Sequence, residues 1–318
     1  MKTLYLDGCS GLDVRLDGPA LRVRRPGRAD AHYPLPRVAR VVAVGRVHWQ
    51  AEALAACLSE HKPLAVLDNQ GRFVRALFRA PGPQYGLARH LGELLGVPRF
   101  RMRYEQWLRA AEQAEMLATI RQLDIPRRDS QADNTWQIVC FEQRRRWRIR
   151  VGRCHRYLLG LAAAQIASAF LLIGLPRDPR NWDRQEYGLF SGMVRLERWR
   201  QALLLEQVLS RRAGQPERWE LTAAFEGKSD ERERRIAAWR QRALLEMMGV
   251  DHAEEESTGC GADRKQWPFE ISAALAQRCQ TAFNRASNRG RVAFGAPGSL
   301  RRSARILRAY LEYDRRIA

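Results

Sequence analysis

A dense run of arginines around one tryptophan is the part of this sequence whose chemistry is easiest to define. The run consists of Arg144, Arg145, Arg146, Trp147, Arg148, Arg150, Arg153 and Arg156. Guanidinium groups bind phosphates, and an aromatic ring among them can stack on a base or pack inward. In a continuous helix, Arg145, Arg148 and Arg156 would lie near one stripe and Trp147 on another. We therefore predict a DNA-backbone surface here; the alternative is a solvated helix face.

Two other charged segments call for different interpretations. A second basic run, residues 285–291 followed by Arg301, Arg302, Arg305 and Arg308, would add DNA contacts or be a solvated tail. Residues 230–235 (DERERR) mix both signs at helical spacing, which is typical of a solvent-facing, internally paired helix. We assign no function to that segment.

Groups that could perform nucleophilic or nucleotide chemistry are scattered. His32, His48, His61, His90 and His155 stand singly, which is typical of packed or surface histidines. No Ser-His-Asp or Cys-His arrangement can be specified, and the sequence has no Walker loop and no GxGxxG. The sequence therefore gives no support for a hydrolytic triad or a dinucleotide site.

The composition favours a polyanionic partner. The chain has 55 Lys and Arg against 35 Asp and Glu, a net charge of +20 and a pI of about 10.8. Such an excess favours nucleic acid over an acidic membrane surface, and 45% hydrophobic residues suffice for real cores. Because the six cysteines form no CxxC pair and no signal peptide opens the chain, we expect reduced thiols in a cytoplasm.

One apolar segment raises the question of a membrane. Residues 158–175 (LLGLAAAQIASAFLLIGL) are about long enough to span a bilayer. The segment is Ala-rich and contains Gln165 and Ser168, and arginines flank it on both sides. We expect a buried bundle helix and no membrane, with a membrane anchor as the weaker alternative.

The elements that must position these residues divide into two regions. Short apolar alternations separated by glycine turns fill the first 80 residues, with strands expected at 38–44, 63–68 and 71–78 and one helix around 51–59. Beyond Pro81-Gly82-Pro83 the apolar spacing becomes helical. We predict an α+β fold: a β-rich domain over 1–80, then a larger all-α domain over 81–318.

The first 78 residues carry a family resemblance. The opening LYLD, Tyr33-Pro34-Leu35, VARVVAVGRV, EALAACLSEHKPLAVLD and GRFVRALF occur in an order similar to the N-terminal β-domain of the CRISPR-associated spacer-acquisition endonuclease and integrase family. The resemblance implies dimerisation through this domain, a helical DNA-binding domain, a small companion protein and a role in antiviral defence. It covers the C-terminal segment LRRSARILRAYLEYDRR loosely and the middle of the chain poorly.

The resemblance also implies a metal site, and the sequence departs from it. The family uses Mg²⁺ or Mn²⁺ held by Glu, His and Asp, with the Glu in a Leu-Leu-Gly-Ile-Glu-Gly-type helix. The similar segment here is Leu158-Leu159-Gly160-Leu161-Ala162, so the Glu position falls on Ala162. Alanine cannot ligate a metal, and residues 157–175 contain no carboxylate. A proline-rich turn at 176–181 agrees with this register.

Substitute ligands are to be sought further along the chain. His252, Asp263 and Glu270 could loosely take the roles of the family's His and acidic ligands. The alternative is a solvated acidic loop, since residues 253–257 (AEEES) look exposed.

Two functional hypotheses follow from these patterns. The first is a CRISPR adaptation protein that binds double-stranded DNA as a homodimer and acts as a Mg- or Mn-dependent endonuclease and integrase inserting spacers. The second is a non-catalytic DNA-binding or assembly subunit that kept the fold and lost the metal ligands. Ala162 is the feature that favours the second.

Overall fold

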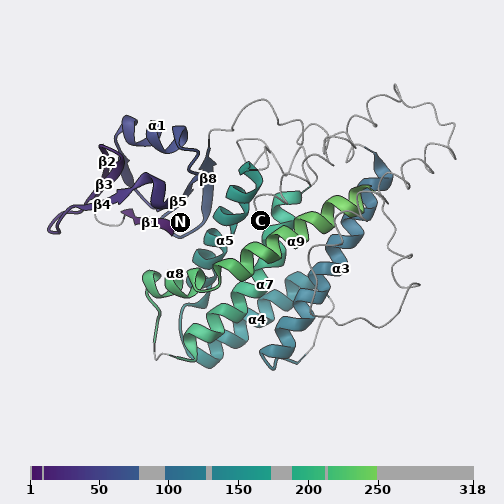
Figure 1. The fold of residues 1–318 in the computed structure, drawn as a ribbon. Coiled ribbons are helices and arrows are strands. Elements are labelled where there is room, and N and C mark those ends of the chain that lie inside the picture. Colours follow the sequence, from purple (N-terminus) through teal and green to yellow (C-terminus); the bar gives the residue numbers. More distant parts are fainter. Residues whose placement is uncertain are drawn as a thin grey trace, which may run out of the picture. The chain divides into compact units, whose positions relative to one another are not determined.

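The computed structural model describes residues 2–8, 11–78, 97–126, 131–172, 188–211 and 214–248. The chain forms two compact units, Met1–Tyr85 with Leu108–Trp239, and Gly86–Trp107 with Arg240–Ala318. Most of the described residues belong to the first unit. Strands precede helices along it, which confirms the predicted α+β class (Figure 1).

Sheet A is built from the apolar runs of the first 78 residues. Its strands are β1 (Lys2–Asp7), β5 (Val38–Val44), β7 (Leu64–Leu67) and β8 (Phe73–Leu77), in the order β1-β5-β7-β8. The first three pair in parallel and β8 pairs antiparallel to β7. Because both faces of β5 are covered, the strand reads as an almost continuous apolar run.

Sheet B has the strand order β4-β3-β2-β6, and its strands are interleaved along the chain with those of sheet A. It contains β2 (Leu12–Asp17), β3 (Ala20–Arg24), β4 (Ala31–Pro34) and β6 (Val47–Trp49). The turn between β2 and β3 uses Gly18 at φ 55°, a conformation that glycine adopts without strain. Helix α1 (Ala51–Ser59) and the short 3₁₀ helix η2 (Leu35–Arg37) complete this region, with one core joining both sheets and α1.

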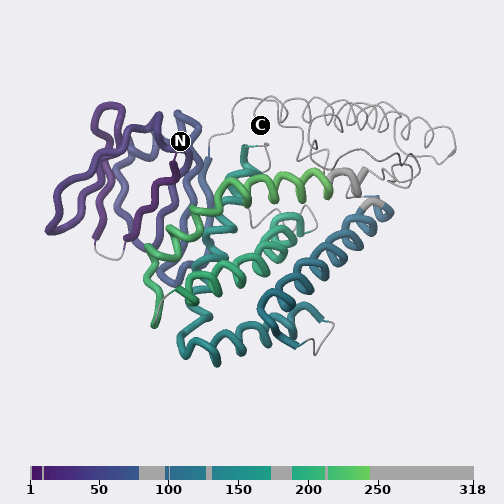
Figure 2. The backbone as a smooth tube through the Cα atoms, turned by 60° about the horizontal axis from the view of Figure 1, so that its bottom comes forward, coloured from purple at the N-terminus to yellow at the C-terminus, as the bar shows by residue number. Residues whose placement is uncertain are grey.

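Six helices of the described chain follow the sheets. They are α3 (Pro98–Gln122), α4 (Ala132–Trp147), α5 (Val151–Leu172), α7 (Leu189–Leu209), α8 (Arg218–Glu226) and α9 (Ser229–Met248), and Figure 2 traces the backbone through them. The helix breaks between α3 and α4 and between α7, α8 and α9 fall where Gly, Pro, Asp and Ser cluster in the sequence.

Helix α5 is the centre of the first unit. Its apolar side chains form one core with Val42, Val44 and Leu67 of sheet A and with side chains of α7 and α8. Gly160 lies directly against Gly71, where an added Cβ would clash with the carbonyl oxygen of Gly71. Among the described helices, α5 alone is long and apolar enough to cross a membrane, yet most of it is buried inside the protein. It is a core helix, as predicted.

Arginines of α7 hold the helices of the first unit together through ion pairs. Arg198 bridges the buried Glu112 of α3 and Asp133 of α4, each at 2.9 Å. Arg195 also pairs with Glu112 at 2.8 Å. These arginines are engaged within the fold, so the net positive charge of the chain is not all available to a partner. A functional division of the chain at residue 80 stays a prediction.

Candidate nucleic-acid interface and metal site

The predicted arginine surface is a corner between two helices and not one helix. Helix α4 ends at Trp147, and Arg148 caps it in the left-handed conformation at φ 53°, its backbone N–H donating to the carbonyl of Arg144 at 2.9 Å. Helix α5 begins two residues after the buried Ile149, at Val151. The single stripe expected for Arg145, Arg148 and Arg156 is therefore wrong, because the chain turns at Arg148.

The predicted DNA-binding side chains separate into two groups. Arg145 pairs with Glu142 at 2.7 Å, and Arg146 pairs with Glu206 at 2.8 Å. The other arginines of the run are exposed and have no side-chain hydrogen bond or ion pair with any described residue; they are Arg144, Arg148, Arg150, Arg153 and Arg156. We call these five residues the arginine corner. Uncommitted guanidinium groups around the junction of two helices are suited to phosphate contacts.

The arginine corner is held in place by Trp147 and by Gln215. Trp147 is half-buried and packs against the core around α5, as expected for a ring that points inward. Gln215 bridges to the start of α5: its Oε1 accepts from the Arg150 backbone N–H at 3.0 Å, and its Nε2 donates to Cys154 Sγ at 2.9 Å. The turn that carries the exposed arginines is thus fixed by the segment that leads into α8.

A buried histidine supports the same corner. His155 Nε2 lies 2.8 Å from Gln143 Oε1, and Gln143 Nε2 donates to both the Ala202 carbonyl and Glu206. Since the amide nitrogen already donates, its oxygen accepts from a neutral imidazole. Burial lowers the pKa of His155 to about 4. His155 is therefore a packed structural histidine, as its isolated position in the sequence predicted.

The family's glutamate position is apolar in the structure. Ala162 is fully buried in α5 and belongs to the core that α5 forms with sheet A, α7 and α8. The next polar side chains toward the end of the helix are Gln165, one turn on, and Ser168, which donates to the Ala164 carbonyl at 2.8 Å. No described carboxylate lies on α5.

A cationic side chain reaches α5 one turn beyond Ala162. Arg232 of α9 is 1% exposed; its guanidinium donates to Gln165 Oε1 and, at 2.9 Å, to the Phe225 carbonyl. Burial lowers the pKa of Arg232 to about 10, which leaves it charged near neutral pH. The interpretation of residues 230–235 as a solvent-facing helix is thus wrong for Arg232. Its partners lie 7 and 67 positions away, so no local pattern signals its burial.

The described residues do not fit a divalent metal at this position. A metal site here would need oxygen donors around an open space, whereas the structure has a buried methyl group at Ala162 and a guanidinium nearby. Within the described ranges, no group of three or more His, Cys, Asp or Glu side chains is arranged to hold a metal. His252, Asp263 and Glu270 lie outside the described residues, as do the second basic run and the proline-rich turn at 176–181.

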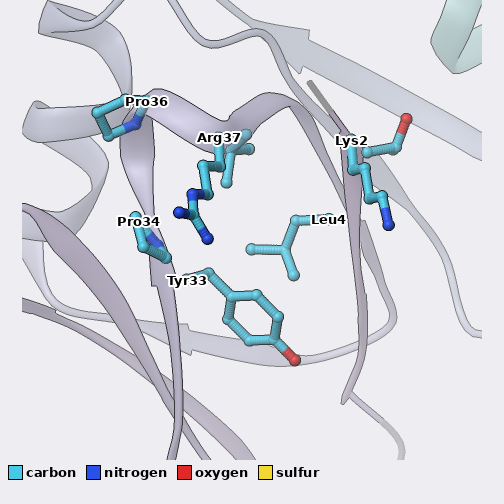
Figure 3. A pocket seen from close by; sticks show the side chains of 8 residues that line it. Lys2, Leu4, Tyr33, Pro34, Pro36 and Arg37 are labelled. Carbon is cyan, nitrogen blue, oxygen red and sulfur yellow. The ribbon is translucent and has the colours of Figure 1, made fainter.

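A shallow pocket on the β-rich region is also not a site of this chemistry. It measures about 600 Å³ and opens between β1, β4 and η2, and Figure 3 shows Lys2, Leu4, Tyr33 and Arg37 among the side chains that line it. Its lining contains no carboxylate and no histidine. It offers apolar surface beside two sheet-edge strands, which suits a protein contact better than a reaction.

One residue that the sequence did not single out is Trp219, at the start of α8. It is 66% exposed, which is unusual for so large an apolar side chain. The only local signal is the capping box of Glu217 and Glu220, which predicts a helix start but not the exposure of the ring.

Comparison with known proteins identifies the fold. Residues 5–137 match the family model described as CRISPR associated protein Cas1. Among curated proteins no match is found. A Cas1 protein from Thermotoga maritima superposes with a TM-score of 0.60 at 12% identity, covering 77% of this chain and 97% of its own.

Two further solved structures share the architecture. A TtCas1–DNA complex aligns with a TM-score of 0.56 at 9% identity, over 85% of this chain and 97% of that protein. A casposase bound to its integration product aligns with a TM-score of 0.51 at 12% identity, over 89% and 100%. At such low identities these likenesses show the fold alone. The family match over residues 5–137 and the shared architecture thus make this chain similar to Cas1 proteins in sequence over that range and in fold.

Proposed function

We propose that this protein is a cytoplasmic CRISPR adaptation protein that binds double-stranded DNA through the arginine corner. The observation that carries the proposal is the contrast between two sets of arginines. Those of α7 are engaged by Glu112, Glu115 and Asp133, whereas the five arginines of the corner are exposed without a described partner. One of the structural neighbours is described as a complex with DNA.

The surroundings of Ala162 favour a DNA-binding or assembly subunit over a nuclease. A methyl group in an apolar core with a guanidinium one turn away contributes no ligand for Mg²⁺ or Mn²⁺. The second candidate function is a metal-dependent endonuclease and integrase, supported by the family match and by the neighbour bound to an integration product. In this chain it would depend on ligands such as His252, Asp263 and Glu270.

We also propose that the protein works as a homodimer formed through its β-rich region, beside a small companion protein. The pocket between β1 and β4 supports the first part, because it combines apolar surface with two unpaired sheet edges. Sedimentation of the protein alone, compared with a Tyr33→Glu variant that changes an exposed side chain of this pocket, tests the homodimer: a monomer with wild-type DNA affinity per chain is expected for the variant. An unchanged dimer would remove this surface from the proposal.

The arginine corner is tested by DNA binding over a salt series. We expect the logarithm of affinity for a labelled duplex to fall linearly with the logarithm of salt concentration. Replacing Arg148, Arg150 and Arg153 with Gln should lower the slope by about 3, since each lost phosphate contact removes about one unit.

The matched control removes the same charge from the β-rich region. Arg24, Arg28 and Arg46 are exposed there and are replaced together with Gln. Because net charge changes equally, any difference between the two triple variants reports the location of the DNA. Equal slopes would show that the corner is not the binding surface.

Chemistry is tested separately on a labelled branched DNA with Mg²⁺ or Mn²⁺. The DNA-binding subunit is expected to bind without metal-dependent cleavage or strand joining. Activity that is lost on changing His252, Asp263 or Glu270 to Ala would instead establish the endonuclease and integrase and a relocated metal site.

A further inference from the structure

Trp219 presents an indole ring to solvent in a fixed orientation. Its Nε1 donates to Glu217 Oε2 at 2.7 Å, which ties the edge of the ring to the helix start. Glu217 is itself fixed by the capping box, in which Glu220 accepts from the Glu217 backbone N–H at 2.7 Å. No aromatic or cationic group of the described chain lies over the ring. Its faces are therefore open and preorganised.

The contacts of α8 place this ring beside the arginine corner. Thr222 Oγ1 lies 2.8 Å from the hydroxyl of Tyr157, so α8 packs along the first turns of α5. Trp219 precedes Thr222 by three positions, and Arg153 precedes Tyr157 by four; each pair lies on one side of its helix. Trp219 and Arg153 therefore extend in the same direction from the Thr222–Tyr157 contact.

The direction of the two helices gives the same result. Gln215 contacts Arg150 and Cys154, Thr222 contacts Tyr157, and Arg232, after α8, contacts Gln165. The segment that runs from Gln215 through α8 to Arg232 of α9 therefore advances along α5 in the direction of the α5 chain. Trp219 lies between Gln215 and Thr222 in sequence, so it stands level with residues 150–157, the part of α5 that carries the exposed arginines.

We propose that Trp219 is a stacking platform for an unpaired base at the end of a duplex whose backbone is held by the arginine corner. Bases within a duplex already stack on one another, so an open indole face gains most from a base that has lost its neighbour. The adjacent guanidinium groups supply the phosphate contacts that a protein partner of the ring would not need. The proposal deepens the DNA-binding function and rests on it.

The acidic side chains near Trp219 are compatible with this role. Glu217 and Glu220 are both occupied by hydrogen bonds at the helix start, and Arg218 next to them donates to Asp7 at 3.1 Å and to the Asn69 carbonyl. The Glu217 carboxylate therefore holds the edge of the ring, and the Glu220 carboxylate holds the backbone of Glu217. In this proposal the arginine corner makes the phosphate contacts.

The test compares two DNA molecules that differ in one feature. One is a blunt duplex, and the other is the same duplex with a short 3′ single-stranded extension carrying 2-aminopurine next to the junction. Anisotropy gives the two affinities, and 2-aminopurine fluorescence reports stacking. Wild-type protein is expected to bind the extended duplex more tightly and to quench the probe.

Trp219→Ala should weaken binding of the extended duplex about tenfold or more and abolish quenching, while blunt-duplex binding stays unchanged. Trp219→Phe should restore most of both signals, because a smaller ring still stacks. Phe141→Ala removes another exposed aromatic ring, 63% exposed on α4, and should change neither signal.

The outcomes separate the two levels of the proposal. If no DNA is bound by the wild-type protein, the DNA-binding function fails. If both DNAs are bound but Trp219→Ala affects neither the preference nor the quenching, the stacking role is refuted while DNA binding stands. A variant that loses blunt-duplex binding as much as extended-duplex binding would also refute stacking, and its unfolding midpoint would show whether the fold is affected.

Discussion

Placing a carboxylate at position 162, where the sequence resemblance puts a glutamate, is the most direct test of whether this position can hold a metal. Ala162→Glu places a longer side chain in a fully buried position among the apolar residues around α5. The added volume alone costs about 1–3 kcal/mol of unfolding free energy. An ionised carboxylate in such surroundings costs several kcal/mol more unless it is paired. Since a typical domain has about 5–15 kcal/mol in total, the variant should be markedly destabilised.

Ala162→Gln is the matched control, because it adds the same volume without the charge. Burial raises the pKa of the new carboxyl above that of the unfolded chain, so the folded state binds more protons. The stability gap between the Glu and Gln variants should be small below about pH 4, where the carboxyl is neutral in both states. It should grow by about 1.4 kcal/mol per pH unit above that, up to the raised pKa.

The assay is urea unfolding of both variants between pH 4 and 8, with and without Mn²⁺. A Glu variant as stable as the Gln variant at pH 7, further stabilised by Mn²⁺ and active on branched DNA, would refute the reasoning. It would show that position 162 opens on a metal-binding space. Pairing of the new carboxylate with Arg232 is distinguished by a gap that is small at pH 7 and unaffected by Mn²⁺.

Three further predictions concern the fold. Burial lowers the pKa of His155 to about 4 against about 6.5 when unfolded, so stability should fall by about 3 kcal/mol as the pH drops from 6.5 to 4; His155→Gln should flatten this dependence in urea unfolding. Gly160→Ala should cost more than a surface Gly152→Ala in thermal unfolding, because the methyl group would meet the Gly71 carbonyl; equal costs would contradict this packing. Arg232→Leu should lower stability by about 2–4 kcal/mol by leaving buried acceptors unpaired, and a neutral or stabilising effect would contradict the importance of its hydrogen bonds.

The sequence was sufficient for elements whose side-chain pattern is local. Residues 38–44 form the buried strand β5, residues 51–59 form α1, and the apolar spacing after residue 98 forms α3. In each, a period of two or a three-to-four-residue repeat decides the conformation. The burial of α5 was also predictable, because its polar residues are few and its flanks are basic.

Neither the turn at the arginine corner nor the burial of Arg232 could be predicted from local sequence patterns. Arg148 adopts a left-handed conformation that its residue type does not favour, so a continuous helix was the natural expectation. Arg232 is indistinguishable in sequence from its exposed neighbours, and its burial depends on Gln165, 67 positions away, and on Phe225 of the preceding helix. Which arginines are free to bind DNA follows from such long-range pairing.

The shared core of sheet A and α5 has a consequence for synthesis on the ribosome. Val42, Val44, Ala65 and Leu67 pack against side chains of α5, α7 and α8, among them Leu158 and Phe225. The strands are therefore complete long before the helices that cover them have been made. Since the ribosome adds about 5–20 residues per second, the helices that cover this apolar face are completed on the order of ten seconds after the strands. During that interval, nascent chains need isolation from one another or a chaperone to prevent aggregation.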